Sequence, residues 1–333
     1  MKKFIALLLC LAMVFALAAC GTETGNDEPK GEESGAPVAG GNLTFGTGGE
    51  TGTYYAFGGV LAQYVSGNTD TTVTAVSSKG SQANIEDLDA GDIQLGFVQS
   101  DVMSYAYNGE RLFESPITDF SVVAALYMEQ VQIVTLNPDI KTVADLKGKT
   151  VSVGAAGSGV YFNAVDVLGA YDIDIDNDIT AVKQDFADST ESLQDGKIDA
   201  AFIVAGAPTN AISSLAATKD VYLVSLDQEH IDILRQSSPY YSPNTIPADA
   251  YGTPEDVTTV AVNAVVIARD DCSETDIYNF VSSIFENIDS LSHAKAEELD
   301  LDFAASVTDV PYHPGAAKYF TEKGIEVPVK TAE

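Results

Sequence analysis

Two glycine-rich stretches decide the fold of this chain. Residues 45–55 read FGTGGETGTYY, and residues 153–162 read VGAAGSGVYF. In each stretch an apolar strand runs into a glycine-rich turn, and a helix-forming segment follows the turn. A strand, a tight turn and a helix in this order begin a βαβ unit. The sequence therefore predicts an α/β fold that starts the same way twice.

A second pair of stretches repeats in the same register. Residues 86–93 read EDLDAGDI and precede the apolar pair Phe97-Val98, whereas residues 191–198 read ESLQDGKI and precede Phe202-Ile203. Gly52 and Gly159 in the first pair of stretches are 107 residues apart, and Glu86 and Glu191 in the second pair are 105 residues apart. In both halves a helix should end at glycine, which tolerates positive φ, and a buried strand should follow. We therefore predict two lobes with one design.

Two β-branched runs predict where the chain crosses between the lobes. The first run is 131–136, and the return is 258–262 with 265–267. We expect lobe 1 to contain residues 42–132 and 259–333, and lobe 2 to contain residues 133–258. The helical spacing of residues 276–291 is assigned to lobe 1. Two crossings make a hinge, so ligand closure would be a rigid-body motion.

The glycine-rich turns also predict where a ligand binds. Open α/β sheets bind ligands at the carboxyl ends of their strands, where backbone N–H groups are exposed at helix N-termini. Each helix N-terminus carries about half a positive charge, so a chain with few arginines can still bind a carboxylate. We expect the backbone of Ser158, Gly159 and Val160 to hold it, with Ser158 as the helix cap. The alternative is that these glycines only permit tight turns.

Motifs along the body follow one another in a specific order. They are residues 46–55, FVQSDV at 97–102, residues 153–159, IPA at 246–248 with DVTTVAV at 256–262, and YHPGAAKY at 312–319. This ordered set resembles the TAXI family of solute receptors, which serve tripartite ATP-independent periplasmic (TRAP) transporters. The resemblance covers the chain after residue 42. It implies an α/β type II periplasmic-binding-protein fold with a ligand cleft between two lobes and a two-strand hinge.

The resemblance implies a receptor without a cofactor and without catalytic activity. Its ligand would be a small carboxylate such as glutamate, a related amino acid or a dicarboxylate, delivered to a TRAP permease that an ion gradient drives. The family has no fixed arginine clamp, but small neutral residues are usual at 78–81, where this chain has Lys79. Lys79 would pair with a second ligand carboxylate or lie at the cleft rim. The alternative function is a secreted enzyme or sensory module with the same fold.

The candidate ligand-binding residues come from both lobes. Asn163 is expected on the first turn of the second-lobe helix, and Gln99 follows a strand whose carboxyl end should face the cleft. The complete set is Thr53, Tyr54, Ser78, Lys79, Ser81, Gln82, Gln99, Ser158, Gly159, Val160, Asn163, Gly206 and Ala207.

The first twenty residues predict export. Lys2 and Lys3 precede an apolar segment at 4–16 that is too short for a membrane span of ~20 residues, and residues 17–20 read LAAC. LAAC resembles the lipobox of bacterial lipoproteins, which implies a signal peptide at 1–19 and a lipid on Cys20. Residues 20–41 are polar and glycine-rich, which predicts a flexible linker. We expect the protein on the outer face of the cell membrane; the alternative is a cleaved signal with an incidental cysteine.

Composition excludes several partners. The formal net charge of −32 opposes nucleic acid and anionic lipid. Cys272 is the one cysteine that neither leaves with the signal nor carries lipid, so we expect no disulfide and no cysteine-based metal site. His230, His293 and His313 lie scattered without ligand-spaced partners, which argues against metal binding. We expect a monomer.

Overall fold

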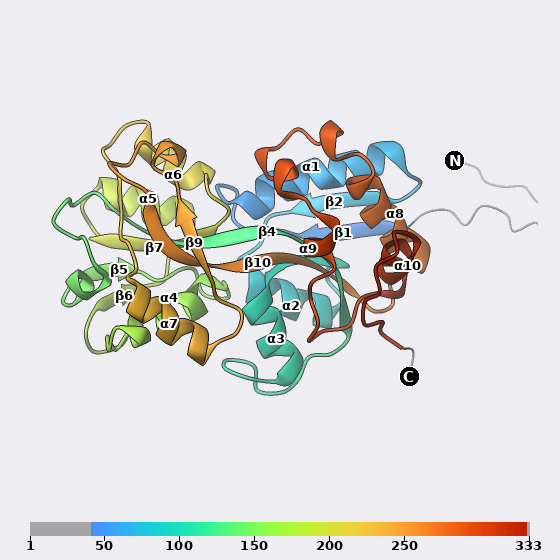
Figure 1. Ribbon diagram of the computed structural model, residues 1–333, viewed down its shortest axis with the longest axis horizontal. Helices are drawn as coiled ribbons and strands as arrows, with labels where there is room; N and C mark the ends of the chain where they lie inside the picture. The colour runs from blue at the N-terminus through green and yellow to red at the C-terminus, as the bar shows by residue number, and fades with distance from the viewer. Residues whose placement is uncertain (1–40, 332–333) are drawn as a thin grey trace, which may run out of the picture. The chain divides into compact units, whose positions relative to one another are not determined.

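The computed structural model describes residues 41–331, which form an α/β fold (Figure 1). The strands are β1 (Asn42–Gly46), β2 (Thr72–Val76), β3 (Leu95–Gln99), β4 (Phe120–Thr135), β5 (Thr150–Ser152), β6 (Thr180–Val182), β7 (Ala200–Ala205), β8 (Tyr222–Leu223), β9 (Ser242–Ile246) and β10 (Val257–Arg269). The α-helices are α1 (Thr53–Asn68), α2 (Ser81–Ala90), α3 (Ser100–Asn108), α4 (Val160–Ala170), α5 (Phe186–Gln194), α6 (Asn210–Ala216), α7 (Gln228–Ser237), α8 (Glu274–Phe285), α9 (Leu301–Ala304) and α10 (Pro314–Glu322). Short 3₁₀ turns are η1 (Val143–Leu146), η2 (Ala248–Ala250), η3 (Ile288–Ser290) and η4 (Ala294–Glu298).

The strands of the described region join in one sheet with the same topology in each half. Their order is β2-β1-β3-β10-β4-β7-β5-β6, with β8 on β4 and β9 on β10. β1 lies between β2 and β3 and is parallel to both, and β5 lies in the same way between β6 and β7. The two long strands β4 and β10 are antiparallel to each other and to these flanking strands. The α/β fold and the twofold design predicted from the glycine-rich stretches are therefore confirmed.

Helices cover both faces of each half of the sheet. In Figure 1, α1 and α8 lie on one face of the first half, and α2 and α3 lie on the other. In the second half α5 and α6 pack together on one face, and α4 and α7 pack on the other. The order and the direction of the strands are both reversed from the first half to the second, so a twofold rotation relates the two halves. Parallel strands buried between two helical layers explain the continuous apolar runs of the sequence.

The long strands β4 and β10 belong to both lobes. The buried apolar side chains of β4 change from the first-lobe core to a second-lobe core between Tyr127 and Val131, and those of β10 change between Val262 and Ala264. The C-terminal helices α8 and α10 contribute to the first-lobe core. The sequence predicted that the chain crosses between the lobes at 131–136, and in the structure most of this segment is the last part of the 16-residue strand β4. The lobe boundaries at 132/133 and 258/259 stay predictions.

Local signals set where several helices end. α2 ends before Gly91, which has φ +84°, and α5 ends just before Asp195 and Gly196, with φ +67° at the glycine. Both glycine stops were predicted from the repeat. The helix predicted over 276–291 ends earlier, at Phe285, because the Asn287 side-chain amide donates to the Ser283 carbonyl at 2.9 Å and caps the last turn.

The signal peptide, Cys20 and all but the last residue of the linker lie outside the described residues. Within residues 41–331, none of the helices combines the length and the apolar character that a membrane span requires. The structure therefore bears on the body of the chain alone.

Candidate functional site

A cavity of about 330 Å³ lies at the carboxyl ends of strands from both halves of the sheet. Gln99 ends β3 and Ala205 ends β7, while Gly48 and Ala155 lie in the turns that follow β1 and β5. The helices α1, α2, α4 and α5 begin at the walls of this cavity. Its size is that of a site for a small molecule.

Nine of the residues predicted from the sequence line the cavity. They are Thr53, Tyr54, Ser78, Lys79, Ser81, Gln99, Ser158, Gly159 and Val160. Gln82, Asn163, Gly206 and Ala207 do not line it. The structure thus brings the turns of both lobes together, and the ligand-binding role of these residues stays a prediction.

Three helix N-termini at the cavity lack side-chain caps. Within the described chain, no side chain accepts from the first-turn N–H groups of α1, α2 or α4, which begin after Gly52, Gly80 and Gly159. By contrast, Asp185 caps α5 by accepting from the Asp188 N–H. The first N–H groups of a helix have no partner within the helix, and the helix dipole adds positive potential there. An anion in the cavity would accept hydrogen bonds from these N–H groups and would be attracted by this positive potential.

The expected cap role of Ser158 is wrong. Both its N–H and its hydroxyl donate to the Ala155 carbonyl, at 3.1 and 2.8 Å. The residue is therefore satisfied within its own turn, and Gly159 occupies the N-cap position with φ −66° and ψ −25°. The backbone donors that this turn can offer to a ligand are reduced to Gly159 and Val160.

Asn163 lies behind the cavity wall, where it joins the two lobes. It is fully buried, and its Oδ1 accepts from Gln99 Nε2 at 2.8 Å. Its Nδ2 donates to Asp101 Oδ2 and to the Tyr241 hydroxyl, both at 2.9 Å. Burial and, to a smaller extent, the nearby Asp166 carboxylate together raise the pKa of Asp101 to about 7. Asn163 thus orients Gln99 and holds lobe 2 against lobe 1 without facing the cavity.

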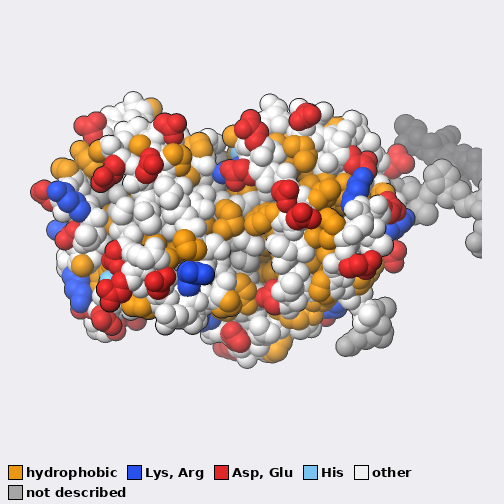
Figure 2. Space-filling view, viewed as in Figure 1, with side chains coloured by type: hydrophobic (Ala, Val, Ile, Leu, Met, Phe, Trp, Pro, Cys, Tyr) orange, Lys and Arg blue, Asp and Glu red, His pale blue; other side chains and the backbone are white. Residues whose placement is uncertain are grey.

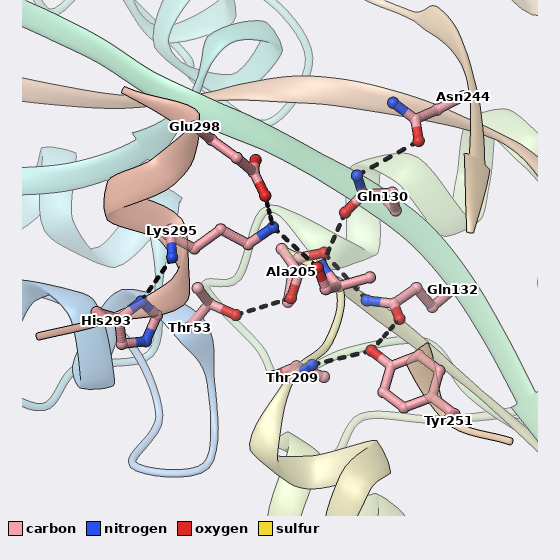
Figure 3. Close-up of polar contacts among 12 residues, drawn as sticks. Thr53, Gln130, Gln132, Ala205, Thr209, Asn244, Tyr251, His293, Lys295 and Glu298 are labelled. Atoms are coloured by element: carbon pink, nitrogen blue, oxygen red, sulfur yellow. Dashed lines mark hydrogen bonds and ion pairs between the residues drawn. The ribbon is translucent and has the colours of Figure 1, made fainter. Parts of the chain in front are cut away.

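Gly206 and Ala207 contact lobe 1 through their main chain, where Thr53 and Lys295 lie close to the end of β7 (Figure 3). The Thr53 hydroxyl donates to the Gly206 carbonyl at 3.0 Å, and Lys295 Nζ donates to the Ala207 carbonyl at 2.9 Å. Gln130 Oε1, on β4, accepts from the Ala207 N–H at 2.8 Å. The loop after β7 is therefore hydrogen-bonded to the start of α1 and to Lys295, and it forms part of the contact between the lobes.

Main-chain hydrogen bonds join the lobes on two further sides of the cavity. The Ala83 N–H donates to the Gly157 carbonyl at 3.0 Å, and the Ala211 N–H donates to the Thr51 carbonyl at 3.1 Å. Arg111 of lobe 1 also pairs with Asp166 of lobe 2. The lobes are therefore in contact on several sides of the cavity.

The lysines of the site lie at its rim. Lys79 and Lys183 are exposed, as are Asp185 and Asp188. Acidic side chains are spread over the face drawn in Figure 2, with few lysines and arginines among them. Gln82 points to an adjoining outer hollow, where its Nε2 donates to Glu86 at 2.8 Å. Within residues 41–331, no three His, Cys, Asp or Glu side chains gather closely enough to hold a metal ion.

Glu129 is the main cavity residue that the sequence analysis missed. Its side chain is 2% exposed, and its Oε2 accepts from the Tyr54 hydroxyl at 2.6 Å. Burial raises the pKa of Glu129 to about 8. The signal for it was present, because Glu129 is the one charged residue in the apolar strand β4. Phe186 was also missed, although the 105-residue register pairs it with Ser81.

Comparison with known proteins places the fold. A model of the NMT1-like family matches residues 45–324. The structure of PhnD1 from Prochlorococcus marinus (MIT 9301), in complex with methylphosphonate, is 12% identical with a TM-score of 0.51, covering 79% of this chain and 89% of that chain. A protein of Bordetella bronchiseptica RB50 is 14% identical with a TM-score of 0.51, covering 79% of this chain and 76% of that one. The periplasmic aliphatic sulphonate binding protein SsuA from Escherichia coli is 18% identical with a TM-score of 0.43, covering 85% and 90%.

Proposed function

This chain belongs to the NMT1-like family, and from that premise we propose that it is an extracytoplasmic solute-binding protein that encloses one small organic anion between its lobes. The observation that carries the proposal is the cavity at which α1, α2 and α4 begin without side-chain caps. Anions bind at such helix ends because the unpaired N–H groups and the helix dipole both favour negative charge. The exposed Lys79 and Lys183 would add positive charge at the entrance.

We further propose that the anion is a carboxylate and that the protein is a TAXI-type receptor of a TRAP transporter. The ordered motifs from residue 46 to residue 319 support this assignment. The ligand would be glutamate, a related amino acid or a dicarboxylate, and a membrane permease would receive it. The contacts between the lobes on several sides of the cavity support binding by closure, which a permease could recognise.

A ligand screen tests the proposed function. We expect at least one amino acid or organic acid to raise the unfolding midpoint of the purified protein, because a ligand that binds only the folded state stabilises it by mass action. At 100 times Kd the gain is about 2.7 kcal/mol. The matched controls are the amides of the same acids, which lack the carboxylate charge and should have no effect.

Two outcomes would contradict this proposal. Stabilisation by sulfonates or phosphonates, with none by carboxylates, would be consistent with a solute receptor but would contradict a carboxylate ligand. Conversion of a bound acid to a product, followed by mass spectrometry, would support the alternative of a secreted enzyme.

A substitution at Cys20 tests the proposed lipid anchor. We expect Cys20→Ser to release the protein from the membrane fraction, since the serine hydroxyl cannot take the thioether-linked lipid. Ligand binding should be unchanged, because residues 20–41 would separate the lipid from the cavity. Fractionation and immunoblotting of the two proteins measure the result, with Cys272→Ser as the matched control. Membrane retention of Cys20→Ser would indicate a spanning signal anchor instead.

A further inference from the structure

Glu129 is a buried acid in the cavity wall, and it would attract a positive charge, whereas the helix ends attract a negative one. The carboxylate lines the cavity wall and is 2% exposed, whereas the other charged residues of the lining, Lys79, Lys183, Asp185 and Asp188, are exposed at the rim. A buried acid is rare unless it is paired with a donor. Of its two oxygens, Oε2 accepts from Tyr54, and none of the residues 41–331 donates a hydrogen bond to Oε1.

The neighbours of Glu129 supply one positive charge, that of Lys295, which other groups share. The titratable groups that face it are Tyr54 of α1, Tyr127 of β4, Asp101 of α3 and Lys295 of η4. The Lys295 ammonium is the one cation among them, and it already binds Glu298 and the Ala207 carbonyl. A donor from inside the cavity would therefore stabilise a negative charge on Glu129.

An all-anionic ligand fits this arrangement less well than a ligand with an ammonium group. A carboxylate group near ionised Glu129 would place two like charges in a buried site, so such a ligand would require Glu129 to keep its proton. A ligand with a carboxylate at one end and an ammonium near it satisfies both the uncapped helix ends and Glu129. A free α-amino acid has these two groups on one carbon atom.

We propose, on the basis of the proposed function, that Glu129 held by Tyr54 binds the ammonium group of an α-amino acid, so that the cavity selects amino acids over amine-free acids of the same chain. Tyr54 fixes the carboxylate through the 2.6 Å hydrogen bond, and its ring is held by stacking on Phe97 with centroids 4.6 Å apart. The helix ends bind the α-carboxylate. Glu129 is therefore a specificity-determining residue of this cavity.

Ligands that differ at one position test the proposal in the unmodified protein. The probes are L-glutamate, 2-hydroxyglutarate and glutarate, which carry an ammonium, a hydroxyl and a hydrogen at the same carbon, and a second series is L-aspartate, malate and succinate. We expect calorimetry to show the amino acid of one series binding about 10 to 100 times more tightly than its amine-free acid, the range typical of a charged hydrogen bond. Equal or tighter binding of the hydroxy acid or the amine-free acid overturns the ammonium assignment while the proposed function stands. If no acid of any kind binds, in these series or in the wider screen, both are overturned.

The Glu129→Gln variant tests whether this side chain causes the preference for amino acids over amine-free acids. The amide keeps the shape but loses the negative charge, so binding of the amino acid should weaken at least about tenfold, and the amine-free acid should bind as well as before or better. The matched control is Glu322→Gln, because Glu322 accepts from the Tyr278 hydroxyl at 2.7 Å on the exposed surface. The control should retain the wild-type preference. An undiminished preference in a folded Glu129→Gln protein overturns the proposal, and Tyr54→Phe, which should reduce the preference severalfold, is measured alongside it.

Discussion

Gly159→Val should abolish measurable ligand binding while the separate lobes stay folded. A Cβ atom at position 159 would lie 1.5 Å from Gln99 Oε1 and 2.9 Å from Ser81 Oγ. Gln99 is buried, and its amide is held by Asn163, so it cannot turn aside without losing that hydrogen bond. The valine would keep the lobes apart at the point where α4 begins.

The measurement compares calorimetric affinity with the unfolding midpoint of the ligand-free protein. Gly169→Val is the matched control, because Gly169 lies on the same helix and an added Cβ meets nothing within 4 Å. We expect the control to bind normally and the ligand-free midpoints of the two variants to be similar. Wild-type affinity in a folded Gly159→Val protein would contradict both the close contact with Gln99 and an anion site at this turn.

Asn163→Ala should weaken ligand binding by a factor of roughly 100 or more. The substitution removes the partner of Gln99 Nε2 and of Asp101 Oδ2, and leaves Tyr241 with its other hydrogen bond, to Asp166 at 2.9 Å. An unsatisfied buried polar group costs ~1–3 kcal/mol. In the closed form of the variant, Gln99 Nε2 and Asp101 Oδ2 would both be buried without a partner, whereas in an open form of the protein water can reach them. The variant should therefore favour the open form.

Asn287→Ala provides the comparison for this prediction. Asn287 also donates through its side-chain amide, at 2.9 Å to the Ser283 carbonyl, but this bond lies within lobe 1 at the end of α8. We expect Asn287→Ala to lower the unfolding midpoint without a change in affinity. Normal affinity in Asn163→Ala would show that the hydrogen bonds between Gln99, Asn163 and Asp101 are not needed in the bound form.

The site could be predicted from the sequence only where its residues belong to the repeated turns. Gly159, Thr53 and Ser81 follow strands in a register that the repeat makes visible, and each lines the cavity. Asn163 lies next to the same turn, and yet its side chain is buried behind the wall. Its direction depends on Gln99 and Asp101, which are more than sixty positions away along the chain. Spacing along one helix does not contain that information.

The sequence by itself determined the α/β class, the repeated halves and the glycines that end α2 and α5, because turn chemistry and apolar periodicity act over a few neighbouring residues. Only the tertiary structure decided that Glu129 faces a cavity, that Ser158 is satisfied by Ala155, and that Gly159 meets Gln99. These features depend on how two lobes approach each other. Burial and hydrogen bonding between distant segments arise from the whole packing, so a local pattern can indicate which residues are available but not which of them face the ligand.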